Sequence, residues 1–248
     1  MCRKRIRLLI LLLLGIVLPM KALMALSPPE TLQATPQQRD DYDWMARHAE
    51  VLALHQQVPP EIVFIGDSIT HHWGGVPIGK RRVAPEVWDE LFAGVTVSNL
   101  GFGFDYADNA YWRILNGELD GIAPRQIFIN IGTNNLGYRG DSPQQCAAHI
   151  IALVRLIQRR QPQAEIIVLG IYPRREAHLV EPIRQTNLLV QQGVRADGVR
   201  FVDVGRCLAG EDGRALPHYF RDVVHPNRAG YARLAVAMRP LIVDGKDE

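Results

Sequence analysis

The stretch Ile62-Val63-Phe64-Ile65-Gly66-Asp67-Ser68-Ile69 decides how this chain folds. Its first four residues are β-branched or aromatic, which favours a strand that is buried on both faces. Gly66 interrupts the apolar run, and Asp67 and Ser68 follow it directly. Open α/β sheets carry their reactive side chains at the carboxyl ends of the strands. The stretch therefore predicts a central parallel strand that presents Ser68 as a candidate nucleophile.

Similar apolar runs recur along the chain and alternate with segments of helical spacing. The predicted strands cover residues 61–66, 95–99, 126–131, 165–171 and 200–204. The predicted helices cover residues 41–55, 85–93, 107–117, 142–160, 181–196 and 227–243. Strands that alternate with helices form a parallel sheet covered on both faces. We predict one α/β domain, a three-layer α/β/α sandwich around a parallel sheet of about five strands.

The first 25 residues differ from the rest of the chain. Four basic residues precede the apolar stretch 8–20, and small residues near Ala25 offer a cleavage site. This layout is typical of a secretory signal peptide, and the apolar stretch is short for a membrane span. An uncleaved anchor is the alternative, because Lys21 and the nearby leucines weaken the cleavage signal. We expect a secreted or periplasmic protein, with no stable membrane span once the signal is removed.

Removing this segment changes the charge of the protein. The full chain has 28 basic and 26 acidic residues, whereas the part after residue 25 has 23 basic residues against the same 26 acidic ones. The basic character thus belongs to the targeting segment, and we expect no nucleic-acid partner. Residues 26–40 are rich in Pro and Gln and predict a linker, followed by a single domain over 41–248.

Two cysteines, Cys146 and Cys207, follow the N-terminal segment. An oxidising compartment permits a disulfide between them, and two separate thiols are the alternative. No His or Cys cluster has the spacing of metal ligands. We therefore expect no metal ion and no cofactor.

Polar, glycine-rich segments follow three of the predicted strands, at residues 66–68, 99–103 and 132–135. Asp222 and His225 lie in a further loop, before the last predicted helix. A serine hydroxyl is a weak nucleophile until a base takes its proton and a third group holds that base. Because the carboxyl ends of parallel strands share one edge, we expect these four loops to converge there.

These four segments, in this order and approximate spacing, resemble the motif blocks of the GDSL, or SGNH, hydrolases. Within that family, residues 111–119, 132–135 and 161–170 are similar to the catalytic subunits of intracellular platelet-activating-factor acetylhydrolase. The similarity extends over nearly all of the chain after the linker. It implies a flavodoxin-like fold and hydrolysis of carboxylic esters without a metal or cofactor.

The resemblance also assigns roles to single residues. Ser68 resembles the nucleophile, and its backbone N–H one donor of the oxyanion hole. His225 resembles the general base and Asp222 the group that orients it. Asn134 resembles the residue whose side-chain amide is a further oxyanion donor, a task that suits an amide because it adds no titrating charge.

One position departs from the family pattern. The remaining oxyanion N–H usually comes from a glycine just before the Asp or Ser of the second block, and the register places Phe104 there, with Gly103 one residue earlier. Either Phe104 donates its N–H and its ring narrows the acyl pocket, or Gly103 takes the role, because glycine tolerates backbone angles that phenylalanine avoids. A ring at this position favours a short acyl group.

Four residues are candidates for the pocket: Asp67, Phe104, Asn135 and Arg174. For Arg174, a structural salt bridge is an equal alternative. His71 and His72 follow the nucleophile closely, but His225 already fills the role of the base. We therefore expect the two neighbouring histidines to be structural or to lie at the rim of the site.

The sequence favours a serine esterase that removes short acyl groups, acetyl above all, from a small-molecule or glycan ester. An exported enzyme meets acetylated carbohydrate, which is the substrate that we expect. The alternative is a lipid-directed esterase, either similar to platelet-activating-factor acetylhydrolase or a lysophospholipase or thioesterase. A non-catalytic glycan-binding module is a remote alternative, because all three residues of the Ser-His-Asp set are present. The resembled subunits form dimers, so a homodimer remains open.

Overall fold

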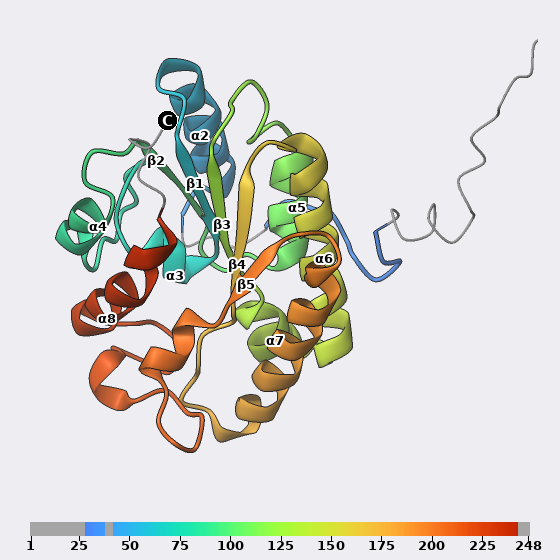
Figure 1. Ribbon diagram of the computed structural model, residues 1–248, viewed down its shortest axis with the longest axis vertical. Helices are drawn as coiled ribbons and strands as arrows, with labels where there is room; N and C mark the ends of the chain where they lie inside the picture. The colour runs from blue at the N-terminus through green and yellow to red at the C-terminus, as the bar shows by residue number, and fades with distance from the viewer. Residues whose placement is uncertain (1–27, 38–41, 243–248) are drawn as a thin grey trace, which may run out of the picture.

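Five parallel strands form the centre of the molecule, in the order β2-β1-β3-β4-β5 (Figure 1). The computed structural model describes residues 28–37 and 42–242. The strands are β1 (Ile62–Gly66), β2 (Val97–Gly101), β3 (Gln126–Asn130), β4 (Glu165–Leu169) and β5 (Arg200–Val202). This order is the flavodoxin-like arrangement, in which ligands bind where the direction of winding reverses beside the first strand. The predicted fold class is confirmed.

Helices cover both faces of the sheet (Figure 1). They are α2 (Trp44–Gln57), α3 (Ser68–His71), α4 (Pro85–Leu91), α5 (Ala107–Leu115), α6 (Pro143–Arg160), α7 (Val180–Arg195) and α8 (Arg228–Met238). A π-helical turn, η1 (Asn135–Arg139), follows β3, and short 3₁₀ turns, η2 (Ala177–Leu179), η3 (Val204–Leu208), η4 (Pro217–Tyr219) and η5 (Arg239–Leu241), complete the described elements.

Alternate residues of each strand face opposite sides of the sheet, so the core is divided in two. Val63 and Ile65 of β1 pack with side chains of α2, α5, α6 and α7. Ile62 and Phe64 pack on the other side with side chains of α3, α4 and α8. Figure 1 shows α4 and α8 on one side of the sheet and α5, α6 and α7 on the other. This double burial explains why the run before Ser68 is apolar throughout.

Strand β2 extends beyond its predicted end. The sequence predicts residues 95–99, whereas the strand runs over Val97–Gly101 and its last residue pairs with Gly66 of β1. The polar Asn99 fits inside a buried strand because its amide donates hydrogen bonds to the carbonyl oxygens of Thr70, at 2.8 Å, and Gly74, at 2.6 Å. The segment after β2 therefore begins at Phe102.

The last helix ends earlier than the predicted boundary at residue 243. Helix α8 stops at Met238, and the turn η5 follows with Pro240 inside it. Proline has no N–H and cannot continue the hydrogen-bond ladder of a helix. The short elements α3 and η1 are not predicted by periodicity, because four or five residues are too few to show it.

The segment that we call the N-terminal strap, residues 28–37, lies against the domain. It is the described part of the predicted linker 26–40, and the predicted signal segment 1–25 lies outside the described residues. The strap packs Leu32 and Ala34 against the core, and the carboxylate of Asp108 in α5 accepts the Gln33 N–H at 2.9 Å. The strap is thus part of the folded unit.

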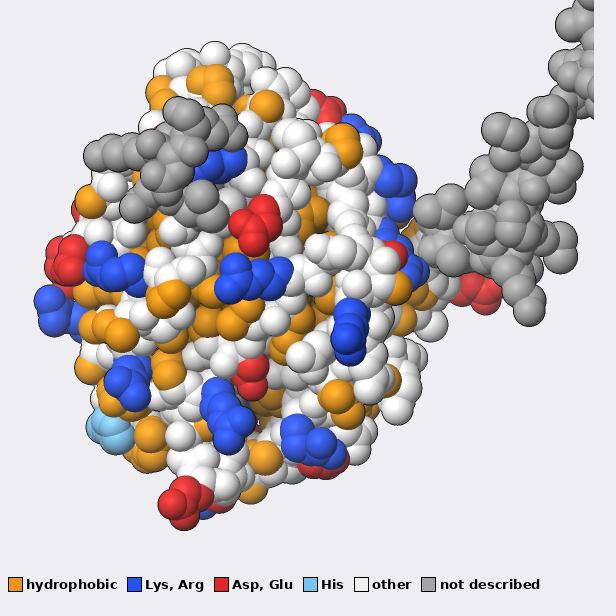
Figure 2. Space-filling model, viewed as in Figure 1, with side chains coloured by type: hydrophobic (Ala, Val, Ile, Leu, Met, Phe, Trp, Pro, Cys, Tyr) orange, Lys and Arg blue, Asp and Glu red, His pale blue; other side chains and the backbone are white. Residues whose placement is uncertain are grey.

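Figure 2 shows one face of the molecule, on which Lys and Arg side chains are spread out and acidic side chains lie among them. The described part of this face carries no basic patch. Cys146 is buried, Cys207 is half-buried, and both are free thiols. Within the described residues, no helix is both long and apolar enough to cross a membrane.

Candidate active site

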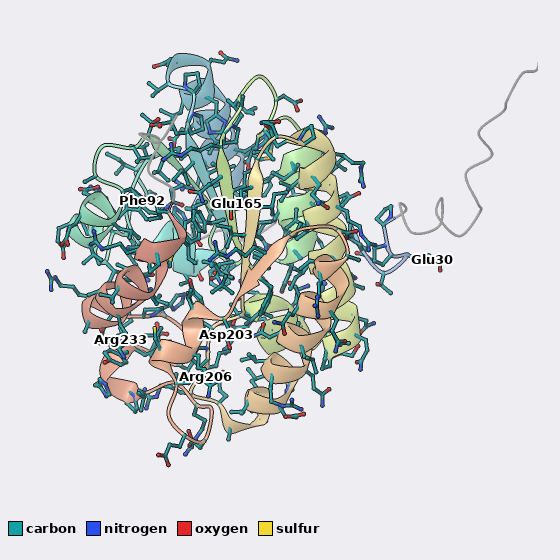
Figure 3. The ribbon with its side chains drawn as sticks, in the orientation of Figure 1. Glu30, Phe92, Glu165, Asp203, Arg206 and Arg233 are labelled. Atoms are coloured by element: carbon teal, nitrogen blue, oxygen red, sulfur yellow. The ribbon has the colours of Figure 1, made fainter. Side chains whose placement is uncertain are left out.

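Ser68 is the first residue of α3, which begins at the carboxyl end of β1. In Figure 3, Glu165 marks the amino end of the sheet and Asp203 the carboxyl end. The helix begins where it does because the carboxylate of Asp67 caps it, accepting the N–H of Ile69 at 2.9 Å. The first N–H groups of a helix have no partner within it, so the Ser68 N–H is available to a ligand.

Two glycines let α3 pack directly on the sheet. A Cβ on Gly66 would lie 2.1 Å from the Thr70 hydroxyl, and a Cβ on Gly101 would lie 2.2 Å from the backbone nitrogen of His71. Any side chain at either position would push α3 away from the strand ends. The glycines at the ends of β1 and β2 therefore fix the position of Ser68.

The structure brings Ser68, His225 and Asp222 together in a chain of hydrogen bonds. The Ser68 Oγ lies 2.8 Å from Nε2 of His225, and Nδ1 of His225 lies 2.8 Å from Oδ2 of Asp222. The second carboxylate oxygen of Asp222 accepts the backbone N–H groups of Val224, at 2.9 Å, and His225, at 2.7 Å. The carboxylate thus holds both the imidazole ring and the backbone that carries it.

The environment keeps the imidazole neutral and the carboxylate charged. Burial lowers the pKa of His225 below its ordinary 6.5, against the opposing effect of Asp222. Partial burial raises the pKa of Asp222, but the N–H groups of His225 and Val224 outweigh it and hold the pKa below 3.8. A neutral imidazole with Nδ1–H bound to a carboxylate leaves Nε2 as an acceptor facing the serine hydroxyl.

Asn134 lies after β3, directly before η1, and is only 2% exposed. Its Nδ2 donates a hydrogen bond to the backbone carbonyl of Asp105 at 3.0 Å. An amide nitrogen has two hydrogens, so this bond orients the side chain and leaves the second hydrogen for another acceptor. The bond also joins the loop after β3 to the loop after β2.

Phe104 is the one non-glycine residue among the described residues with a positive φ, +64°. This left-handed conformation favours glycine, the residue expected here from the resemblance to GDSL hydrolases. The adjacent Gly103 donates its N–H to Nδ1 of His71 at 3.2 Å. Of the two expected donors, Gly103 is therefore already engaged within the protein.

A cavity of about 510 Å³ opens beside Ser68 and His225. One wall comes from the start of α2 and the other from the loop that connects α3 to α4, and Gly103 and Phe104 complete it. Charged side chains lie on both walls: Asp43, Arg47, Glu50, Lys80 and Arg81. Apolar and aromatic side chains, among them Tyr42, Ile78 and Phe104, lie beside them, so the cavity offers mixed polar and apolar surroundings.

The other candidate pocket residues do not line this cavity. Asp67 is buried beneath Ser68 as the helix cap, and burial raises its pKa to about 7. Asn135 accepts the N–H of Ala107 at 3.0 Å and is fully buried. Arg174 forms a two-pronged ion pair with Glu176, at 2.9 and 2.7 Å, which corresponds to the structural alternative.

Two residues beside the site were not predicted to act there. Tyr42 lines the cavity and its hydroxyl donates to the carbonyl of Gly103 at 3.3 Å, while His71 holds the N–H of the same residue. The spacing from Ser68 to His71 was a usable signal, because residues three apart share one face of a helix. Nothing in the local sequence connects Tyr42 to Gly103. Among the residues that the structure describes, no group of three or more potential metal ligands occurs.

A flavodoxin-like fold with a serine in contact with a histidine–aspartate pair defines a class, the α/β/α hydrolases. The GDSL-like Lipase/Acylhydrolase family matches residues 64–233 of this chain. The bovine protein Platelet-activating factor acetylhydrolase IB subunit alpha1 is 33% identical over 208 residues, which cover 82% of this chain and 84% of the relative. The chain therefore belongs to the GDSL-like lipase/acylhydrolase family, and it is an enzyme of the GDSL/SGNH type.

Solved structures agree with this fold. A Streptococcus pneumonia protein named for platelet activating factor matches with a TM-score of 0.67 and 27% identity, covering 79% of this chain and 91% of that one. An acetyl-xylooligosaccharide esterase from Geobacillus matches with a TM-score of 0.58 and 22% identity, over 76% of this chain and 97% of its own. The second likeness shows the fold alone.

Proposed function

We propose that this chain is a secreted serine esterase that removes short acyl groups, acetyl above all, from carbohydrate esters. The observation that carries the proposal is the hydrogen-bond chain from Ser68 through His225 to Asp222, with 2.8 Å at each step. These distances allow the proton transfer that converts the hydroxyl into a nucleophile.

In the first half of the reaction, Ser68 Oγ attacks the ester carbonyl carbon while His225 Nε2 takes the hydroxyl proton. The tetrahedral intermediate collapses, the bond to the alcohol breaks, and the leaving oxygen receives the proton from His225. In the second half, His225 takes a proton from water, and the resulting hydroxide attacks the acyl-enzyme. Collapse of the second intermediate returns the proton to Ser68 and releases the acid.

Three N–H groups stabilise the oxyanion in this proposal: the backbone donors of Ser68 and Phe104, and the side chain of Asn134. Phe104 is preferred over Gly103 because the Gly103 N–H is bonded to His71. Fixed donors of this kind stabilise charge as it develops, and loss of one typically costs about 10²–10³ in rate.

The acyl group is short in this proposal because the half-buried Phe104 lines the cavity where a family glycine would leave room. The charged side chains on the cavity walls can form hydrogen bonds with a polar alcohol such as a sugar, which supports the carbohydrate ester. The acetyl-xylooligosaccharide esterase is named for a carbohydrate ester, although its likeness to this chain supports the fold only.

The second candidate is a lipid-directed acetylhydrolase. The relatives that are about one-third identical favour it, because they are named as acetylhydrolases of platelet-activating factor. Both candidates use the same site and the same short acyl group. They differ in the alcohol that leaves.

Hydrolysis of p-nitrophenyl acetate by purified protein tests the mechanism. The Ser68→Ala variant should lose nearly all activity, and equal rates in the two proteins would rule the mechanism out. A parallel screen on acetylated xylooligosaccharides and on a short-chain phospholipid ester tests the substrate. Faster release of acetate from the phospholipid ester would favour the second candidate.

A further inference from the structure

Two side chains bind Gly103, one at each of the two peptide groups that flank its Cα. The Tyr42 hydroxyl donates to the Gly103 carbonyl at 3.3 Å, and the Gly103 N–H donates to Nδ1 of His71 at 3.2 Å. The rings of Tyr42 and His71 meet edge to face, with their centroids 5.1 Å apart. Tyr42, just before α2, and His71, in α3, therefore both form a hydrogen bond with Gly103.

The hydrogen bond from Tyr42 to the Gly103 carbonyl determines the direction of the Phe104 N–H. In a trans peptide the carbonyl and the N–H of the next residue point in opposite directions. The hydrogen bond from Tyr42 fixes the Gly103 carbonyl, so it also fixes the Phe104 N–H on the opposite side of the same plane. If Gly103 were released, the peptide could rotate and the left-handed Phe104 could relax to a more common conformation.

We propose that Tyr42 and His71 are positioning residues of the oxyanion hole, which hold the Phe104 N–H toward the tetrahedral intermediate. The inference rests on the proposed function, since it assigns Phe104 to that hole. A glycine at position 104 adopts this conformation without strain, whereas the Cβ of phenylalanine makes it unfavourable. The two side chains compensate for that difference.

Both side chains keep the required protonation state across the working range of an esterase. Burial, followed by the charge of Arg47, lowers the pKa of His71 to about 2, so the ring is neutral and its Nδ1 accepts while Nε2 carries the hydrogen. Burial raises the pKa of Tyr42 above its ordinary 10, so the hydroxyl remains a donor. Titration of Tyr42 or His71 should therefore not add a step to the pH profile of kcat.

Three variants test the inference. Tyr42→Phe removes one oxygen and keeps the ring against His71. His71→Leu removes the acceptor, and His71→Asn places an amide oxygen near the position of Nδ1. We expect kcat on p-nitrophenyl acetate to fall about threefold to tenfold in the first two, the factor for one ordinary hydrogen bond, with KM within twofold. His71→Asn should retain most of the activity.

A trifluoromethyl ketone gives a readout that general damage would not change. It adds to Ser68 as a hemiketal whose oxygen resembles the oxyanion, so its inhibition constant should rise by the same factor as kcat falls. Binding of the product acetate should be unchanged. Tyr138→Phe is the matched control, because Tyr138 is 54% exposed and the change keeps the ring that lies against Phe104 while removing one hydroxyl.

The outcomes separate this inference from the proposed function. Wild-type kcat and ketone inhibition in Tyr42→Phe would overturn the positioning role, even if His71→Leu failed to fold. An effect on KM alone would show that Tyr42 only contacts the substrate. Activity that survives Ser68→Ala would instead refute the proposed mechanism. The hydrogen bonds of Tyr42 and His71 to Gly103 would then have no role in catalysis.

Discussion

Two substitutions at Phe104 separate the cost of its left-handed backbone from the contribution of its ring to packing. Replacing Phe104 by alanine removes the ring but keeps a Cβ at φ +64°, and replacing it by glycine removes both. The two variants lose the same ring contacts, so their difference reports the backbone. A Cβ in the left-handed region costs about 1–2 kcal/mol, and glycine loses about 0.4–1 kcal/mol through its more flexible unfolded state.

The difference between these values favours glycine. We expect Phe104→Gly to be more stable than Phe104→Ala by about 0.8 kcal/mol, which is about 2–3 °C in Tm for a domain of this size. Ala49→Gly, at an exposed position of α2, is the control of opposite sign and should destabilise by about 1 kcal/mol. Thermal unfolding followed by circular dichroism measures all three variants. An alanine variant as stable as the glycine variant would refute the strained backbone.

The same two variants test the acyl pocket. If the ring limits the pocket, both should accept hexanoyl and octanoyl esters better, with the ratio of kcat/KM for hexanoyl over acetyl rising at least tenfold. The p-nitrophenyl esters from C2 to C8 give this profile. An unchanged preference for acetyl in both variants would mean that another side chain limits the acyl group.

Three further predictions concern the proposed catalytic residues. Asp222→Asn should lower kcat by about 10⁴, because the imidazole loses the partner that fixes its tautomer; a loss below tenfold would exclude that role. Because His225 must be neutral to act and burial lowers its pKa, the midpoint of the acidic limb of kcat/KM should lie below pH 6.5; a midpoint above pH 6.5 would contradict this assignment. Asn134→Ala should lower kcat by about 10²–10³ with little change in KM, and an effect on KM alone would remove Asn134 from the oxyanion hole.

Much of the fold could be predicted from the sequence because the strands are buried on both faces. The polar residues of runs such as 61–66 and 126–131, namely Glu61, Gln126 and Asn130, lie near the ends of the runs, so the type and order of these strands are clear. The end of β2 could not be predicted, because Asn99 is polar. It is tolerated in the strand only through carbonyl groups of the α3 segment, which are distant in sequence.

The residues of the candidate site also differ in whether the sequence could predict them. Ser68, Asp222 and His225 could be predicted as a group because motif spacing and the parallel sheet place them at one edge. Arg174 could not be assigned, since its pairing with Glu176 depends on the course of the loop after β4. Tyr42 could not be found either, because its contact with Gly103 joins residues 61 positions apart.

The N-terminal strap bears on where a functional form of this protein can begin. Gln37 donates to the carbonyl of Phe104 at 2.9 Å, and the Thr31 hydroxyl lies 2.8 Å from Nε2 of the buried His149 in α6. A recombinant protein that starts at residue 41, the predicted domain boundary, would lose both contacts. Cleavage after Ala25 would keep them and leave only two residues before the described part of the strap. A recombinant protein should therefore begin at or before residue 28, because a later start would remove hydrogen bonds to α6 and to Phe104, which lines the cavity beside Ser68.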